Sequence, residues 1–423
     1  MNKLAQELNK TLGSAAEFLS KEGKRMYFPY GGILGQGGEA KGCQINATIG
    51  MAFEEDGSPL VMDCFGRNIA LGKRAFLYAG SFGLPQLREM WRTMELKKNP
   101  SLKGVAFSNP VVTNALTHGL RIAAELFADK TDELVVPDLY WDNYELIFGE
   151  AVGCKVRHFN TFKRGAFDAD ALKQALLAPG KKKLLILNFP NNPTGYTATV
   201  ADAKKIVAAV AAVAKKGKRI VVILDDAYFG LVYEKGIHGE SLFAEFAKLN
   251  GNVLAVKLDG TTKEDYVWGL RVGFISFAFK DAKEAQLKAL EAKAAGNVRS
   301  CISNASSLGQ HLAIAAYGDK RYWAQKREKY AVLKARYVEI RRILGKHPEY
   351  AANFEVMPFN SGYFMCVKPI GVEAEKVRRH LIAKYSTGTI MLSGLIRLAF
   401  STIPKAKLEK LFANVNAAIA DLK

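Results

Sequence analysis

The feature that most constrains the fold is a series of short, almost uninterrupted apolar runs separated by amphipathic segments. The runs are Glu133–Val136, Lys155–Phe159, Leu184–Asn188, Arg219–Leu224 and Val253–Leu258. Between them, as in Asp168–Leu177 and Val200–Lys215, apolar residues recur every three or four positions, which is the spacing of an amphipathic helix. Strands that are apolar throughout are usually covered by helices on both faces. The pattern therefore predicts an α/β protein with a three-layer, mostly parallel sheet.

The two ends of the chain show a different, α+β pattern. We expect one helix over Leu4–Leu19, an extended glycine-rich arm over 30–42 and a long charged helix over Arg321–Leu344. Further strands are expected at Phe354–Met357, Gly362–Val367 and Ile396–Phe400, with helices at Val372–Tyr385 and after Pro404. A chain of 423 residues is long enough for two or three domains. We predict an N-terminal arm and part of a small domain over 1–55, a large domain over 56–320 and the rest of the small domain over 321–423.

The net charge of +19 permits several partners, including nucleic acid, a membrane surface and small anions. The lysines and arginines are spread from Lys3 to Lys423, and no basic stripe interleaved with aromatic residues appears. We therefore expect no nucleic-acid partner, and the absence of an apolar run of about 18 residues predicts no membrane span.

The cysteines indicate a reducing compartment. Five cysteines are scattered along the chain without a Cys-x-x-Cys pair, which argues against a disulfide framework and against a zinc site. The first thirty residues contain no continuous apolar run of the kind found in secretory signals. Together these observations predict a cytoplasmic protein without a bound metal.

Polar groups follow three successive predicted strands, where ligands of open parallel sheets bind. The loop Asn188–Gly195 contains two prolines and three asparagines, Asp225 and Tyr228 follow the next strand, and Lys263 and Arg271 follow the third. Each group has a structural interpretation by itself: a turn before a helix, a helix N-cap and a solvated surface lysine. Their combination, in this order, is the informative signal.

This combination resembles the class I aminotransferases, which have fold type I and use pyridoxal 5′-phosphate (PLP). The resemblance extends from about Ile45 to Phe400. It implies that Lys263 forms an aldimine with the cofactor aldehyde and later carries a proton at the substrate Cα. It also implies that Asp225 pairs with the pyridine nitrogen, and that Tyr228 and Asn192 hydrogen-bond the ring oxygen.

The resemblance also implies residues for the cofactor's phosphate and ring face. The implied phosphate ligands are Thr113, Asn114, Ala115, Thr261 and Arg271. Gly260 stands where many members have a serine, so Thr261 or Thr262 would replace one phosphate hydroxyl. Trp141, in the segment PDLYWDNY, matches the aromatic residue that stacks on the ring.

Substrate binding and assembly are implied in the same way. Arg397 would hold the substrate α-carboxylate, with Asn192 and Gly50 beside it. Tyr78 matches a tyrosine that reaches the cofactor phosphate of a neighbouring subunit. Arg299 lies where members specific for dicarboxylates place an arginine across the interface. The resemblance therefore implies a homodimer with shared active sites.

The leading functional prediction is PLP-dependent transamination of aspartate, glutamate or an aromatic amino acid with a 2-oxo acid such as 2-oxoglutarate. The reaction would follow a ping-pong route through pyridoxamine phosphate. A β-lyase of the C–S lyase type, on the same scaffold, is the alternative. A DNA-binding regulator with this fold is a third hypothesis, but the roughly 44 residues before Ile45 are too few for a helix-turn-helix module.

Overall fold

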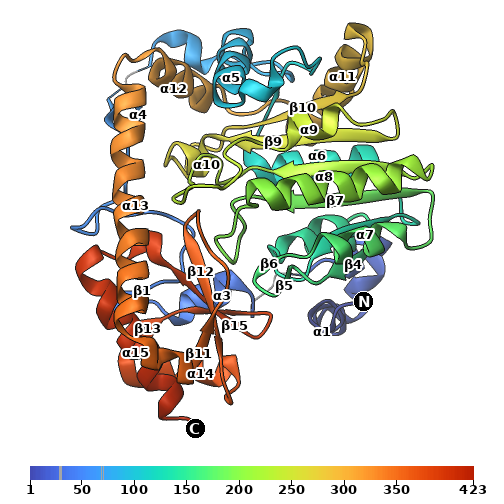
Figure 1. The fold of residues 1–423 in the computed structure, drawn as a ribbon. Helices are drawn as coiled ribbons and strands as arrows, with labels where there is room; N and C mark the ends of the chain where they lie inside the picture. Colours follow the sequence, from blue (N-terminus) through green and yellow to red (C-terminus); the bar gives the residue numbers. More distant parts are fainter. Residues whose placement is uncertain (28–30, 68, 70) are drawn as a thin grey trace.

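The computed structural model describes residues 1–27, 31–67, 69 and 71–423, and within them a large central sheet dominates the architecture (Figure 1). The order of its strands is β2-β10-β9-β8-β7-β3-β4. Their bounds are β2 Val111–Thr113, β3 Glu133–Pro137, β4 Lys155–Phe159, β7 Lys182–Asn188, β8 Arg219–Asp225, β9 Val253–Gly260 and β10 Gly273–Phe279. β10 runs antiparallel to β2 and β9, and the other adjacent strands pair in parallel. The predicted mostly parallel α/β sheet is confirmed, and the sequence analysis missed β2 and β10.

Alternate residues of the central strands face two separate cores. Leu184 and Ile186 of β7 lie in the core beneath α6 (Ala115–Phe127), together with Leu116 and Leu120 of that helix. Leu185 and Leu187 of the same strand lie in the opposite core, beneath α7 (Ala169–Leu177) and α8 (Val200–Lys215). Helices therefore cover both faces, as the continuous apolar runs predict.

The remaining helices of this part of the chain surround the sheet. They are α5 Pro85–Lys98, α9 Phe243–Ala247, α10 Thr261–Glu264, α11 Glu284–Ile302 and α12 Ser307–Gly318. Shorter elements are α4 Asp63–Gly66, a π-helical turn at Glu145–Glu150, β5 Phe162–Lys163 and β6 Ala166–Phe167.

A second, antiparallel sheet is built from the C-terminal residues. Its order is β11-β12-β15-β14, with bounds Phe354–Val356, Phe364–Pro369, Leu395–Ala399 and Ile390–Leu392 respectively. Helices α13 Tyr322–Lys346, α14 Ala374–Tyr385 and α15 Leu408–Ala420 accompany it, and α13 runs from α12 down past this sheet (Figure 1). The N-terminal strand β1 (Ile45–Asn46) pairs with β13 (Thr387–Gly388). The division of the chain at residues 55 and 320 stays a prediction.

Two expectations for the N-terminus are wrong. The first helix, α1, covers only Lys3–Leu12, because Gly13 adopts a left-handed backbone (φ +54°) and a 3-10 turn over 13–18 and the short α2 (Lys21–Arg25) follow. The glycine-rich segment that we expected to be extended contains a helix, α3 (Ile33–Glu39). The first residue of the expected arm, Tyr30, lies outside the described residues.

No helix in the described ranges is long and apolar enough to cross a bilayer. Within the same ranges, no group of three or more histidine, cysteine or acidic side chains is arranged to hold a metal ion.

Candidate active site

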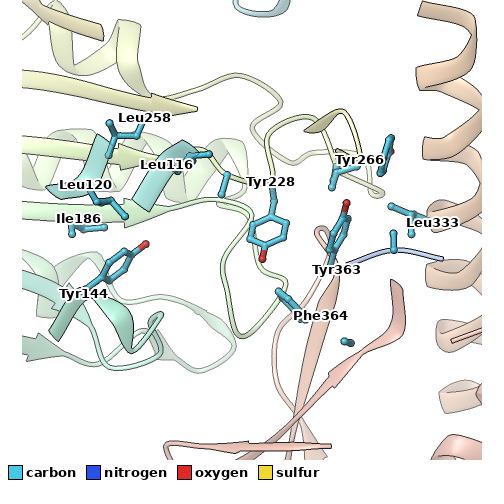
Figure 2. Close-up of a cluster of buried hydrophobic side chains, with 14 of the residues drawn as sticks. Leu116, Leu120, Tyr144, Ile186, Tyr228, Leu258, Tyr266, Leu333, Tyr363 and Phe364 are labelled. Carbon is cyan, nitrogen blue, oxygen red and sulfur yellow. The ribbon is translucent and has the colours of Figure 1, made fainter. Parts of the chain in front are cut away.

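A cavity of about 300 Å³ opens at the carboxyl ends of β7, β8 and β9. Its walls come from both sheets and from the N-terminal segment. The residues lining it are Ile33, Gly50, Ala115, Leu116, Thr117, Trp141, Tyr144, Asn188, Asn192, Asp225, Ala227, Tyr228, Thr262, Lys263, Arg271, Phe364 and Arg397. Figure 2 shows Tyr228 between α6 and the central sheet on one side and Tyr363 and Phe364 on the other. Nine residues singled out in the sequence thus meet in one cavity.

Asp225, the last residue of β8, is fixed by contacts on several sides. Its Oδ2 accepts a hydrogen bond of 2.6 Å from the Tyr144 hydroxyl, and its Oδ1 accepts one of 3.2 Å from the Ala227 N–H. The Asn188 amide donates to its carbonyl oxygen at 2.7 Å. Burial raises the pKa of the Asp225 carboxyl, whereas the Tyr144 hydroxyl and the Lys263 ammonium oppose that rise. A buried carboxylate held this firmly is a suitable partner for a cationic ring nitrogen.

Lys263 lies on the short helix α10, directly after β9, and its Nζ is 5.1 Å from the centre of the Tyr228 ring. Burial lowers the pKa of the Lys263 amine, and nearby Arg271 lowers it further, while Asp225 acts in the opposite direction. A lysine with a lowered pKa is more often neutral and therefore nucleophilic.

Arg397 is almost completely buried in β15, at 1% exposure. Its Nη1 donates to the Asn192 side-chain oxygen at 2.9 Å, and its Nη2 donates to the Thr48 carbonyl at 2.8 Å. Its guanidinium carbon lies 4.4 Å from the centre of the Phe364 ring. The buried Nε has no hydrogen-bond partner among the described residues. Arg397 lines the cavity, and a buried guanidinium with an unpartnered donor is suited to binding a carboxylate.

The other end of the cavity is suited to an anion. The first three residues of α6, Ala115, Leu116 and Thr117, line the cavity. The N–H groups in the first turn of a helix have no partner within the helix and favour an anion. Arg271 lines the same end. The Thr262 hydroxyl also borders the cavity, and within the described chain its buried oxygen has no partner.

These groups fit PLP. Arg271, the α6 N-terminus and the Thr262 hydroxyl supply donors for a phosphate, Asp225 supplies a carboxylate for a pyridinium nitrogen, and Lys263 supplies an amine for an aldehyde. A Cβ at Gly50 would lie 3.4 Å from the Phe364 ring and 3.8 Å from the Tyr228 hydroxyl, which is ordinary van der Waals contact. The donor chemistry and the unpartnered Thr262 hydroxyl therefore agree with a bound PLP.

Five residues singled out in the sequence do not line the cavity. They are Thr113, Asn114, Thr261, Tyr78 and Arg299. The Thr113 hydroxyl donates to the Ala115 carbonyl at 2.9 Å, and the Thr261 hydroxyl donates to the Val272 carbonyl at 3.2 Å, so both are used by the backbone. Asn114 is exposed, Tyr78 is 90% exposed, and exposed Arg299 donates to the Ser303 hydroxyl at 2.7 Å.

Six residues that line the cavity were not singled out in the sequence: Ile33, Leu116, Thr117, Tyr144, Ala227 and Phe364. Tyr144 lies three residues after Trp141 in an aromatic segment, and that spacing is the one signal that could have found it. Nothing in the local sequence of Ile33 or Phe364 distinguishes either residue from an ordinary core residue.

Comparison with known proteins agrees with this geometry. Residues 57–415 match the family model for aminotransferases of class I and II. An aspartate aminotransferase of Pyrococcus horikoshii is 24% identical over 78% of this chain and 80% of its own length. One of Geobacillus stearothermophilus is 28% identical over 57% of this chain and 56% of its own length. The crystal structure of an aminotransferase from Anaerococcus prevotii, at 21% identity, superposes with a TM-score of 0.79 and covers 99% of this chain and 96% of its own.

The family match covers most of the chain, and the superposition confirms the expected fold type. Because every residue that lines the cavity except Ile33 and Gly50 lies within the matched region, and the cavity carries the groups that PLP requires, the expected cofactor and enzyme class agree with both findings. The chain belongs to the class I and II aminotransferases, enzymes that depend on pyridoxal 5′-phosphate.

Proposed function

We propose that this protein transfers the amino group of aspartate, glutamate or an aromatic amino acid to a 2-oxo acid such as 2-oxoglutarate. The observation that supports the proposal most is the meeting of Lys263, Asp225, Arg271 and Arg397 in one cavity of about 300 Å³. Two guanidinium groups and one carboxylate there match a ligand with two anionic groups and one basic nitrogen, and Lys263 adds an amine.

When bound, PLP supplies an electron-withdrawing ring. In this proposal Asp225 pairs with the ring nitrogen, Tyr228 and Asn192 donate to the ring oxygen, and Trp141 covers one ring face. Arg271, the α6 N-terminus and Thr262 hold the phosphate. Lys263 would accept the proton of the substrate Cα, which requires a neutral amine; the lowered pKa of Lys263 supports this role.

Arg397 binds the substrate α-carboxylate and thereby orients the Cα–H bond toward Lys263. The Asn192 side-chain oxygen already accepts from Nη1 of Arg397, so the two residues act together. Burial lowers the pKa of the Arg397 guanidinium, and a bound carboxylate would compensate for that desolvation.

The substrate side chain would meet Ile33, Trp141 and Phe364, which are apolar or aromatic, and no further basic side chain lines the cavity within the described residues. An aromatic amino acid suits these walls directly. Aspartate or glutamate requires a further cation, and Arg299 of a neighbouring subunit would supply it. The names of the two curated relatives support the dicarboxylates, and in this proposal the protein works as a cytoplasmic homodimer.

The test is a single-turnover reaction followed by chemical trapping. Transamination predicts one 2-oxo acid, with the carbon skeleton of the donor, per active site and no free ammonia. A β-lyase would release pyruvate and ammonia or sulfide. Borohydride reduction of the PLP-loaded protein should attach the cofactor to Lys263, and Lys263→Ala should abolish the adduct. An adduct on Lys257 or another lysine would contradict the assignment.

A further inference from the structure

Both reactive residues of the site are followed by buried carboxylates that the proposed chemistry does not use. Asp226 follows Asp225, and Glu264 and Asp265 follow Lys263. Their exposed fractions are 4%, 1% and 0%. Burying a carboxylate is costly unless a cation and hydrogen-bond donors compensate, so the partners of these three residues are informative.

On the Lys263 side, the partners come from two distant helices. Glu264 lies 3.0 Å from the Lys98 ammonium of α5 and 2.7 Å from the Lys326 ammonium of α13. Lys326 also lies 3.0 Å from Asp265, which accepts hydrogen bonds from the hydroxyls of Tyr317 at 2.9 Å and Tyr322 at 2.7 Å. Two lysines therefore hold the end of the short helix that carries Lys263.

The Asp225 side joins the same set of charges. Lys257 lies 3.1 Å from Asp226 and 3.1 Å from Glu95, and it also pairs with Asp259. Glu95 lies 2.7 Å from Lys98. The contacts are continuous from Asp226 to Asp265. We call this set the lysine–carboxylate network; its members are Lys98, Lys257, Lys326, Glu95, Asp226, Asp259, Glu264 and Asp265.

The network holds three lysines and five carboxyl groups. Burial and the neighbouring Glu95 raise the pKa of Asp259, while Lys257 and Lys98 hold the pKa of Glu95 at about 2 against its burial. Loss of one lysine would leave buried negative charge next to Lys263 uncompensated.

Helix α13 joins the network to the opposite wall of the cavity. Lys329, one turn after Lys326, lies 2.7 Å from Glu54, and Arg336 lies 2.8 Å from Glu55. Both carboxylates are in the segment that follows Gly50, which lines the cavity. One helix thus contacts the Lys263 turn and the segment bearing Gly50.

We propose that Lys326 is a positioning residue: it holds Glu264 and Asp265, fixes the turn that carries Lys263, and links that turn to α13. The proposal rests on the proposed function insofar as Lys263 is the reactive amine. Besides the network, the charged and titratable groups around Lys263 are Asp225, Arg271, Tyr228 and Tyr363, whose hydroxyl donates to the Lys263 carbonyl at 3.0 Å. Those four are unchanged in the experiment below, so a change in Lys263 can be attributed to Lys326.

The experiment compares Lys326→Met with Lys334→Met, which removes an exposed lysine from the same helix. The rate of Lys263 acetylation by acetic anhydride is measured against pH in the cofactor-free protein, with peptide mass mapping. Without Lys326, the negative charges of Glu264 and Asp265 would favour the ammonium form of Lys263. Lys326→Met should therefore shift the apparent pKa of Lys263 upward. A shift of one unit slows labelling at pH 8 by about tenfold. Lys334→Met should leave the profile unchanged.

Two further variants separate charge from packing. Lys326→Arg keeps the cation and should restore the labelling profile. The double variant Lys326→Met/Glu264→Gln removes one charge of each sign, so it should fold even if Lys326→Met alone does not. Its pH profile of Lys263 acetylation should return toward that of the wild type. A folded Lys326→Met protein with the wild-type profile overturns the proposal. Because labelling needs neither cofactor nor turnover, a failure to transaminate would be seen separately.

Discussion

At the scale of single residues, the interaction between Tyr144 and Asp225 is the most specific feature of the site. The tyrosine hydroxyl donates to the carboxylate at 2.6 Å in a fully buried setting, and it opposes the rise in the pKa of Asp225 that burial causes. A hydrogen bond to a charged group contributes about 1.5–3 kcal/mol. Tyr144 therefore helps to keep Asp225 ionised, which the proposed contact with a ring nitrogen requires.

Tyr144→Phe should lower kcat/KM by about tenfold at neutral pH, the equivalent of 1.4 kcal/mol. The pKa of Asp225 rises when the donor is lost, so the fall in activity on acidification should begin at a higher pH than in the wild type. A pH profile of kcat/KM measures both effects. Tyr140→Phe is the matched control, because the Tyr140 hydroxyl donates to Glu145 at 2.9 Å. Equal profiles for the two variants would contradict the assignment.

The residues of the site divide into those that sequence could predict and those that depend on three-dimensional contacts. Asp225 and Lys263 follow buried strands, and that position alone placed them at the sheet edge. The sequence could not decide whether Thr261 or Thr262 supplies a hydroxyl for the phosphate. That choice depends on a tertiary contact, because the Thr261 hydroxyl donates to the Val272 carbonyl. Gly260 also has a tertiary cause: a Cβ there would lie 2.6 Å from the Val272 carbonyl oxygen, so pairing with β10 excludes the usual serine.

At the scale of elements, α3 shows how contacts distant in sequence override local preference. Three glycines among the seven residues of ILGQGGE favour an irregular arm, and the predicted extended conformation was wrong. The side chain of Gln36 explains the helix. Its amide donates to the Gly31 and Met391 carbonyls, both at 3.0 Å, and its oxygen accepts from the Met391 N–H at 2.7 Å. Gln36 therefore docks α3 on β14 and brings Ile33 to the cavity.

Gln36→Ala should release α3 from β14. The Met391 N–H and carbonyl would lose their partners, which costs about 1–3 kcal/mol. We expect faster amide hydrogen exchange over residues 31–42 and a several-fold rise in KM for the amino acid, with a smaller change in kcat. Leu34→Ala is the control, because Leu34 lies in the same helix and is 70% exposed. Unchanged exchange in Gln36→Ala would show that other contacts hold the helix.

At the scale of the whole molecule, one surface exposes three consecutive large side chains that a monomeric protein would usually bury. Phe76, Leu77 and Tyr78 are 76%, 66% and 90% exposed. The Ser81 hydroxyl donates to the Ser303 carbonyl at 2.8 Å, and Arg299 donates to the Ser303 hydroxyl, so the segment after Tyr78 lies beside the end of α11. Contiguous exposed apolar residues commonly mark an interface. The predicted homodimer would bury this surface and bring Tyr78 and Arg299 to the partner's cavity.

Subunit complementation tests this assembly and the role of Arg299 together. Lys263→Ala removes the reactive amine, and Arg299→Ala should remove most of the activity with aspartate. If Arg299 acts across a twofold interface, a mixed dimer of the two variants contains one intact site. Co-expression should then recover about a quarter of the wild-type aspartate activity per total subunit, since half of the random dimers are mixed.

Lys263→Ala co-expressed with the double variant Lys263→Ala/Arg299→Ala should stay inactive. Recovery would fail if the protein were monomeric or if Arg299 served its own subunit. Retention of full aspartate activity by Arg299→Ala alone would instead leave the apolar walls at Ile33, Trp141 and Phe364 to select an aromatic substrate.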